Sequence, residues 1–390
     1  MKGVFSLKGV IKHYDWGGFS LIPSLLKQDN SLKQPFAEYW LGTHPLGVAE
    51  VEFEKGARGG LDSLAGELPY LLKILDVKDM LSIQVHPSKK DAETEFAREN
   101  EAGIPLTAAN RNYKDPNHKP EMMVALGEFW LLHGFKPEAA LQATLENVAE
   151  LNPLLPVFKS GSYAALYKHI MEMPVEKVNQ LLRPLVDRIT PLYEAGDLKK
   201  DNPEFWAARA AATFSGEENL DRGIFSIYLF NLVHLQAGEG IFQEAGLPHA
   251  YLEGANVELM ANSDNVLRGG LTPKHIDVPE LLKHVKCTPT HPRIIRGDMR
   301  EESEQQFSTP VPDFRLSMYE LKAGETVSFH PEGVEIVLLT AGQAELDDEE
   351  NLVKLRPGNP SAVIFPGETV YLAAATDCIV FRAGEGYPQS

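Results

Sequence analysis

A change in hydrophobic periodicity divides this chain more sharply than any other feature of its sequence. Up to about residue 135, short apolar stretches such as 68–75 and 81–87 alternate with turns rich in Gly, Pro, Asp and Lys, a pattern that predicts strands. From Pro137 to about Gly216, apolar residues recur three and four positions apart, which predicts helices. After Gly223 the β pattern returns and continues, with one helical interruption (PELLKHV), towards the end of the sequence.

Strand-like segments on both sides of the helical stretch indicate that the helices are inserted into a β domain. We therefore expect a mainly β fold with an α-helical insertion, divided into three domains. The first β domain takes residues 1–136 and 217–299, the inserted helical domain takes 137–216, and the second β domain takes 300–390. A length of 390 residues agrees with this division, because domains usually hold about 100–200 residues.

A faint internal repeat favours two related β domains. Two pairs of segments are alike, LQAGEGIF (235–242) with LKAGETVS (321–328), and GLPHAYL (246–252) with PGETVYL (366–372). Two copies of strand, glycine turn and strand are typical of a pair of jelly rolls. Thr369 then stands where His249 stands in the first copy, so only the first copy would carry the chemistry. The alternative is that acidic glycine turns between strands look alike by chance.

Charge and composition exclude several kinds of partner. The formal net charge is −18, whereas nucleic-acid binding requires a basic face, so we expect no nucleic-acid partner. No stretch approaches the roughly 20 apolar residues of a membrane span, and no signal-peptide pattern is seen, so we expect a cytoplasmic monomer without membrane contact. Cys287 and Cys378 lie far apart, outside metal-type spacing, and we expect them to be reduced. A few local Lys and Arg side chains can still bind a small anion.

The stretch from Ser82 to His86 alternates polar and apolar residues. Successive side chains of a strand point to opposite faces, so Ser82, Gln84 and His86 should share one face. Ile83 and Val85 should then share the other face, which is suited to burial. A solvated strand face shows the same pattern, so this segment alone does not establish a binding site.

Two further segments offer potential ligands. Glu121 precedes the apolar run 122–126, where a buried carboxylate needs a cation or a metal as its partner. Lys119 should lie on the same strand face, although an ordinary Lys–Glu turn is the alternative. Pro248 fixes the backbone before His249 and so helps to direct the imidazole, yet most lone histidines are structural or exposed.

The combination is more informative than its parts. Two imidazoles, one carboxylate and one amide oxygen come from His86, His249, Glu121 and Gln84. Two histidines with one carboxylate and an open position suit a catalytic Zn²⁺, and Fe²⁺ uses a similar trio. The absence of a cysteine cluster from the sequence excludes a structural zinc knuckle. Spacing alone does not show that the four side chains converge.

Long motifs of this chain resemble those of the type I phosphomannose isomerases. They are LPYLLKILDVKDMLSIQVHPSKKDAE, NYKDPNHKPEM and PHAYLEGANVELMANSDNVLRGGLTPKHID, and the openings YDWGG and AEYWLGTHP are also similar. The resemblance spans about residues 5–285 in ordered blocks. It implies two jelly-roll (cupin) domains with an inserted helical domain and one zinc ion per chain. It also implies interconversion of D-mannose 6-phosphate and D-fructose 6-phosphate, feeding mannose and GDP-mannose metabolism.

The resemblance assigns roles to individual residues. The implied zinc ligands are Gln84, His86, Glu121 and His249. Arg268 matches the active-site arginine of the family and Lys119 its active-site lysine, while Asp264 and Lys274 fall in matching pocket positions. The positions that resemble those proposed to hold the substrate phosphate are Lys73 and Ser82.

An aldose–ketose isomerase needs a base that takes a C–H proton and groups that stabilise an enediolate. Arg268 could stabilise the developing charge, because a guanidinium stays protonated at any working pH. Positive neighbours would favour the neutral amine of Lys119 and make it a candidate base. The alternative is that Lys119 serves only to neutralise Glu121, in which case Asp264 or His118 could move the proton.

Other functions remain open. A cupin Fe²⁺ oxygenase would share the two histidines and the carboxylate, but Gln84 as a fourth ligand would close a position that O₂ and substrate need. A non-catalytic sugar-phosphate sensor would keep Lys73 and Ser82 and could lose Arg268 or a zinc ligand. A structural storage protein has no use for a full polar pocket.

Overall fold

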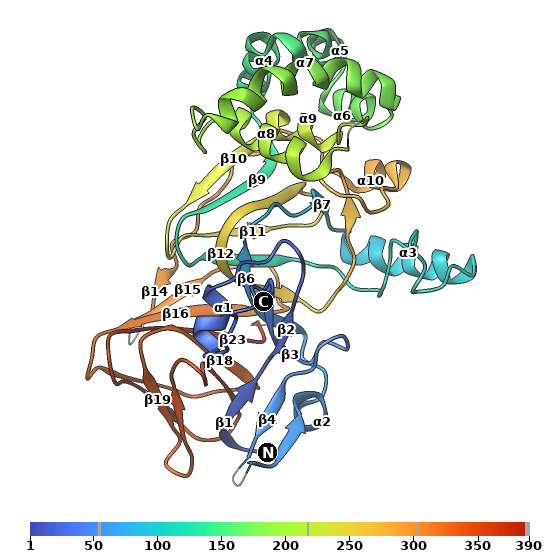
Figure 1. Cartoon of the computed structure of the whole chain (residues 1–390). Helices are drawn as coiled ribbons and strands as arrows, with labels where there is room; N and C mark the ends of the chain where they lie inside the picture. The colour runs from blue at the N-terminus through green and yellow to red at the C-terminus, as the bar shows by residue number, and fades with distance from the viewer. Residues whose placement is uncertain (54–55, 217, 301–302, 387–390) are drawn as a thin grey trace.

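The computed structural model describes residues 1–53, 56–216, 218–300 and 303–386. Figure 1 shows a helical region at one end, a first β domain in the middle and a second β domain at the other end. The predicted mainly β fold with a helical region is therefore confirmed. Among the described residues, no helix combines the length and the apolar character needed to cross a membrane.

The first β domain is built around one long strand, β12. Its ten strands are β2 (Val10–Lys12), β3 (Glu38–Gly42), β6 (Tyr70–Val77), β7 (Gln84–Val85), β8 (Glu121–Ala125), β9 (Phe129–Phe135), β10 (Phe230–Leu235), β11 (Gly240–Gln243), β12 (His249–Ala261) and β13 (Leu267–Arg268). The start of β12 pairs with β7 and β9, and its later part pairs with β6 and β8. One strand therefore brings residues from four others to the same interior.

The second β domain has a nine-stranded and a four-stranded sheet. Its strands are β1 (Gly3–Lys8), β4 (Glu50–Glu52), β5 (Arg58–Gly60), β14 (Asp298–Met299), β15 (Glu304–Phe307), β16 (Arg315–Leu321), β17 (Thr326–Phe329), β18 (Glu335–Ala341), β19 (Ala344–Asp347), β20 (Leu352–Leu355), β21 (Ser361–Phe365), β22 (Val370–Ala374) and β23 (Cys378–Gly384). The turns after Leu235 and Leu321, between β10 and β11 and between β16 and β17, have equal length, but four strands separate β17 from β22 whereas β12 follows β11 directly, so the internal repeat stays a prediction.

The sheets depart from the predicted domain boundaries at the N-terminus. β1, β4 and β5 lie within residues 1–136, yet β1 pairs with β21 and so joins all three strands to the second β domain. Val4 packs in the core of that domain, and Leu7 faces the core shared with the first. The prediction missed this because a pairing across more than three hundred residues leaves no local pattern. The rest of the domain division stays a prediction.

The helical region packs on one end of the first β domain. Its helices are α4 (Glu138–Asn147), the 3₁₀ helix η2 (Ala149–Leu154), α5 (Leu155–Ser160), α6 (Tyr163–Met171), α7 (Val175–Glu194), α8 (Pro203–Phe214) and α9 (Gly223–Leu229). In α7 the buried residues Val178, Leu182 and Leu185 recur at helical spacing. They share a core with Ile83 and Val85, the apolar face predicted for that segment.

Two predictions of strand were wrong. Residues 223–229 form helix α9 rather than a strand, and every residue in it is buried. An apolar run buried on all sides shows no periodicity, so sequence alone does not separate helix from strand. α3 (Lys89–Glu101) lies within the stretch predicted to be strand-like, and the Ser88 side chain caps it by accepting from the Asp91 backbone N–H. Smaller helices α1 (Leu21–Leu26) and α2 (Leu61–Ala65) lie there too. The predicted helical interruption is α10 (Val278–His284).

Candidate metal centre

Cross-strand pairing sets two rows of side chains inside the first β domain. Gln84 lies directly opposite His249 on β12 and Arg268 on β13, so the three side chains share one face. On the facing strands, Glu121 of β8 lies opposite Gln243 of β11. The register alone therefore brings the Gln84 amide, the His249 imidazole and the Arg268 guanidinium together in one row. It places the Glu121 carboxylate and the Gln243 amide in a second row.

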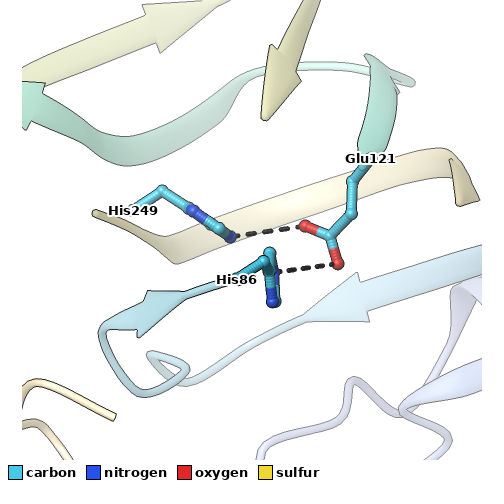
Figure 2. Close-up of side chains that lie close together, drawn as sticks. All are labelled: His86, Glu121 and His249. Carbon is cyan, nitrogen blue, oxygen red and sulfur yellow. Dashed lines mark ion pairs between the residues drawn. The ribbon is translucent and has the colours of Figure 1, made fainter. Parts of the chain in front are cut away.

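Figure 2 shows His86, Glu121 and His249 converging on one point. The Nε2 atoms of His86 and His249 lie 3.5 and 3.3 Å from the two carboxylate oxygens of Glu121. One ligand atom from each residue lies within 4.8 Å of the others, and all three residues are buried. Three donor atoms of these types at such spacing could hold a metal ion.

Hydrogen bonds fix the direction of both imidazoles. Nδ1 of His86 lies 2.9 Å from the Asn265 backbone oxygen, and Nδ1 of His249 lies 3.0 Å from that of Leu247. A carbonyl oxygen only accepts, so each Nδ1 carries a proton and each ring turns its Nε2 towards Glu121.

The electrostatics of the three residues favour a cation between them. Burial lowers the pKa of His86 to about 4, so its ring is neutral near pH 7, and its Nε2 is buried without a hydrogen-bond partner in the described structure. A lone pair that faces a carboxylate across 3.5 Å is favourable only with a positive charge between them. The residues present therefore fit a divalent metal.

Lys119 is the nearest protein cation to this group. Its Nζ lies 2.8 Å from Oε1 of Glu121. Burial would raise the pKa of Glu121, but Lys119, His86 and a hydrogen bond from His249 hold it well below its usual value. Glu121 is thus an ionised carboxylate, as a metal ligand must be.

Lys73 lies deeper in the pocket, between two carboxylates. Its Nζ is 3.4 Å from Glu258 and 3.9 Å from Glu38, and the side chain is only 7% exposed. Burial would lower the pKa of Lys73, but Glu38 and Glu258 raise it. Burial and then Glu121 raise the pKa of Glu258, whose Oε2 accepts a 2.8 Å hydrogen bond from the Tyr251 hydroxyl.

Arg268 and Lys274 supply positive charge without a matching carboxylate. In the described parts of the chain, no hydrogen bond or ion pair involves the Arg268 guanidinium, whose pKa is lowered by burial. Lys274 is exposed, and its pKa is lowered by burial and then by Arg268, which places the two cations within electrostatic reach. Ser82 is half-buried near the start of β7. Free cations at the edge of an acidic pocket are suited to an anionic ligand.

Asp264 borders the same pocket, whereas His118 is engaged elsewhere. Oδ2 of Asp264 lies 3.4 Å from Nε2 of His44. Burial would raise the pKa of Asp264, but His44, Lys119 and Lys73 lower it. His118 Nε2 lies 2.9 Å from Asp313, which ties it to the connection between β15 and β16 of the second β domain.

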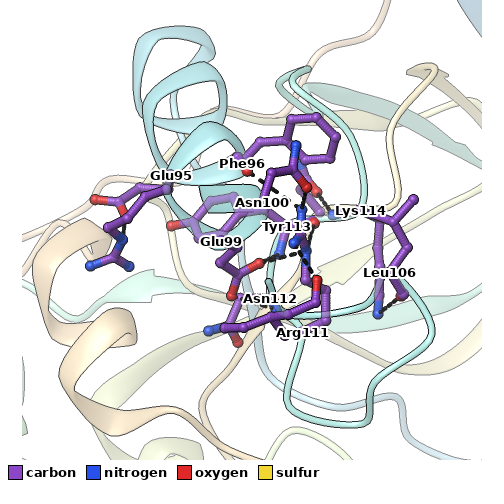
Figure 3. A network of polar contacts seen from close by, with 12 residues as sticks. Glu95, Phe96, Glu99, Asn100, Leu106, Arg111, Asn112, Tyr113 and Lys114 are labelled. Atoms are coloured by element: carbon purple, nitrogen blue, oxygen red, sulfur yellow. Dashed lines mark hydrogen bonds and ion pairs between the residues drawn. The ribbon is translucent and has the colours of Figure 1, made fainter. Parts of the chain in front are cut away.

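A buried arginine anchors the loop that leads to Lys119 and Glu121. Figure 3 shows Arg111 between α3 and this loop, where its Nε lies 2.8 Å from Glu99 and its Nη1 donates to the Ile104 backbone oxygen. The loop is tied to the metal centre by Asn265, whose Oδ1 accepts from the Lys114 backbone N–H at 2.7 Å while its backbone oxygen contacts His86.

A second group with ligand-type side chains, Glu95, Glu280 and His284, is neutralised by the protein itself. Glu280 accepts from Arg98 at 3.0 Å and from Lys283 at 2.7 Å. Burial would raise its pKa, yet its hydrogen bonds lower it to about 2. These cations leave no charge for a metal to balance, so this group does not match the first.

The sequence-based reasoning missed several pocket residues, chiefly Glu258 and Tyr251. A usable signal was present: Glu258 alternates with the apolar residues Val257 and Leu259 on β12, as Gln84 alternates with Ile83 and Val85. Glu38 and His44 carried no such signal, because they reach the pocket only through the pairing of β3 with β6.

The chain is similar in sequence and in structure to known mannose-6-phosphate isomerases. Residues 4–138 match the family model described as "Phosphomannose isomerase type I, catalytic domain". The mannose-6-phosphate isomerase of Salmonella typhimurium is 35% identical over 391 residues, which cover 94% of this chain and 96% of the relative. The human mannose-6-phosphate isomerase is 31% identical, with 97% and 98% covered. The solved Salmonella typhimurium enzyme bound to its substrate and to zinc superposes with a TM-score of 0.87 at 32% identity, over 99% of this chain and all of that one.

Proposed function

The chain belongs to the type I phosphomannose isomerase family, and we propose on that basis that it interconverts D-mannose 6-phosphate and D-fructose 6-phosphate at the His86, Glu121 and His249 site. It is a zinc-dependent aldose–ketose isomerase. The observation that carries the assignment to this site is the convergence of two imidazole nitrogens on one buried, ionised carboxylate. Gln84 lies beside His249 in the same row and would provide the fourth ligand through its amide oxygen.

The charge balance of the pocket supports a divalent ion. Its acidic groups are Glu38, Glu121, Glu258 and Asp264, and the lysines among them are Lys73 and Lys119. Carboxylates therefore outnumber the lysines that face them, and burial makes an unbalanced charge costly. When bound, zinc polarises the sugar oxygens at C1 and C2.

We expect the substrate phosphate to bind where the described structure has cations without a carboxylate partner. Arg268 has no protein partner in the described structure and Lys274 lies near it, whereas Lys73 is already paired with Glu258 and Glu38. A dianionic phosphate gains most where positive charge is not yet neutralised. We therefore place the phosphate at Lys274, with Ser82 as a hydrogen-bond donor, rather than at Lys73, and we assign Arg268 to the reacting end of the sugar because it lies opposite the proposed ligand Gln84.

Isomerisation takes the hydrogen at C2 of mannose 6-phosphate as a proton and adds a proton at C1, while the C2 hydroxyl proton moves to O1. Asp264 is held ionised by His44 and the pocket lysines, so it can accept a proton. Lys119 adjoins the proposed ligand Glu121 and can donate to a sugar oxygen. Arg268, opposite the proposed ligand Gln84, stabilises the charge that develops on the enediolate. His118, bound to Asp313, is disfavoured.

The other candidate functions lack a supporting observation. The relatives do not favour an iron oxygenase or a non-catalytic sensor, because they are mannose-6-phosphate isomerases and the similarity covers nearly their whole length. We also propose a cytoplasmic monomer, on the net charge of −18 and two free cysteines. Light scattering of the purified protein would test the monomer, and a stable dimer would overturn it.

The function is tested by identifying the product. Zinc-loaded protein is incubated with mannose 6-phosphate labelled with ¹³C at C1, and the mixture is followed by NMR. The C1 aldose signal should convert to the C1 signal of fructose 6-phosphate until equilibrium. Unlabelled mannose competing at equal concentration should not slow the reaction, because it lacks the phosphate. No conversion by zinc-loaded protein would overturn the proposal.

A further inference from the structure

Gln243 carries a side-chain amide that is buried beside the Tyr251 hydroxyl and makes no hydrogen bond of good geometry in the described structure. The residue is fully buried, and both Nε2 and Oε1 lack a hydrogen-bond partner. An unsatisfied buried amide destabilises a protein, whereas an apolar side chain of similar size would not. The position therefore calls for an explanation beyond packing.

The register places this amide beside the proposed zinc ligand Glu121. Gln243 ends β11 and is the direct partner of Glu121 on β8. Side chains of such partners lie on one face with their Cβ atoms about 4.5–5.5 Å apart.

His133 extends the same buried polar group. It is the direct partner of His249 on β9, and its Nε2 lies 3.3 Å from the backbone oxygen of Phe242, the residue before Gln243. Since that oxygen only accepts, Nε2 carries the proton and Nδ1 is an acceptor, and it too has no partner in the described structure.

Metal binding would change which hydrogen-bond donors reach the Glu121 carboxylate. The two oxygens of Glu121 are now approached by Nε2 of His86 and of His249 and by Lys119. Imidazoles that ligate a metal through Nε2 no longer offer a hydrogen bond there. A carboxylate that ligates through one oxygen leaves the other in need of donors, and groups that supply them orient the ligand.

We propose that Gln243 is a positioning residue for the metal centre: its Nε2 donates to the carboxylate of Glu121 in the zinc-loaded protein and fixes the rotation of that ligand. This inference rests on the proposed metal site. Lys119, in the loop just before β8, and Gln243, at the end of β11, then both approach the carboxylate, and His133 accepts the second N–H of the same amide. Gln243 itself does not touch the substrate.

The test compares Gln243→Leu with Asn256→Leu. Asn256 is a matched control, because it is also fully buried with both amide atoms unpartnered in the described structure, but it lies opposite Leu75 and Ala125, away from the ligands. Zinc affinity is measured by competition with a chromophoric chelator, and the cobalt-substituted protein is examined by visible absorption. Gln243→Leu should weaken zinc binding about tenfold or more and alter the cobalt spectrum, while Asn256→Leu leaves both unchanged.

The outcomes separate this inference from the metal site itself. Gln243→Leu with wild-type zinc affinity and cobalt spectrum would overturn the positioning role alone. An equal loss of zinc affinity in Asn256→Leu would also overturn it, because any buried amide inside the first β domain would then have the same effect. If Gln243→Leu fails to fold, Gln243→Met keeps the length of the side chain and is measured in its place. A wild-type protein that binds no zinc would overturn the metal site first.

Discussion

Lys73 and Glu258 lie directly opposite each other on β6 and β12, and Nζ of Lys73 is 3.4 Å from Oε1 of Glu258 inside the first β domain. The family resemblance pairs Lys73 with the substrate phosphate, but this lysine is buried and already neutralised. Arg268 is half-buried and has no such partner among the described residues. The described structure thus separates Lys73, which is paired near the proposed metal ligands, from Arg268 and Lys274, which have no described carboxylate partner.

Lys73→Met should destabilise the fold as well as the reaction. Removing one member of a buried ion pair leaves the other unpaired, which costs about 3–5 kcal/mol. The free energy of unfolding in urea measures the loss, and Lys73→Met with Glu258→Gln should recover much of it. A Lys73→Met protein of wild-type stability with only a raised KM would instead support a phosphate contact.

Arg268→Ala should keep zinc and the fold but lose most turnover. A missing donor at a developing negative charge lowers kcat about a hundredfold or more. Arg296→Ala is the matched control, because that arginine is 77% exposed and pairs only with Glu239 in the described structure. Steady-state kinetics and metal analysis decide the matter, and near-normal turnover would remove Arg268 from the mechanism.

Lys274→Ala should raise KM more than it lowers kcat. A contact to the phosphate is made equally in the ground state and the transition state, so its loss weakens binding uniformly. Inhibition by inorganic phosphate should weaken in parallel. An unchanged phosphate inhibition constant would place Lys274 outside the phosphate site.

Lys136→Met should stabilise the protein at neutral pH. Burial lowers the pKa of Lys136 from 10.5 to about 8, and its Nζ has only the Thr144 hydroxyl as a described partner. Between pH 8 and pH 10.5 the Lys136 amine holds a proton in the unfolded chain but not in the folded chain. The free energy of unfolding therefore rises with pH in that window. Below pH 8 the full cost of burying the charged amine lowers the stability of the fold.

The substitution should therefore add about 1–3 kcal/mol at pH 7 and flatten the rise between pH 8 and 10. Urea unfolding at several pH values measures both effects. Lys168→Met, which removes an exposed lysine of α6, serves as the control. A Lys136→Met protein with the wild-type pH slope would contradict the assignment.

Local patterns predicted the parts of the site that lie on single segments. Alternation placed Gln84 and His86 on one face and Ile83 on the other. The structure buries Ile83 and Val85 as expected, and it packs them against the helices, which was not predicted. The same rule applied to β12 would have found Glu258. The predicted ligands His86, Glu121 and His249 do converge, although their role as ligands awaits the metal measurements.

What the sequence did not reveal depends on long-range pairing or on uniform burial. β1 joins the second β domain only through β21, and Gln243 becomes a neighbour of Glu121 only through the β11–β8 register. α9 is apolar on all sides, so its pattern has no period to read. Such features follow from the assembled sheets, which local periodicity does not describe.

The most direct test of the account is turnover of mannose 6-phosphate, measured by a coupled assay for fructose 6-phosphate, before and after dialysis against a chelator and after zinc is restored. Glu121→Gln and His249→Ala are carried alongside, and zinc content is measured for every sample. Activity should vanish with the metal and return with zinc, while both variants lose zinc and activity together. Full turnover in protein shown to be free of metal, or unchanged zinc in the dialysed variants, would contradict the proposed centre.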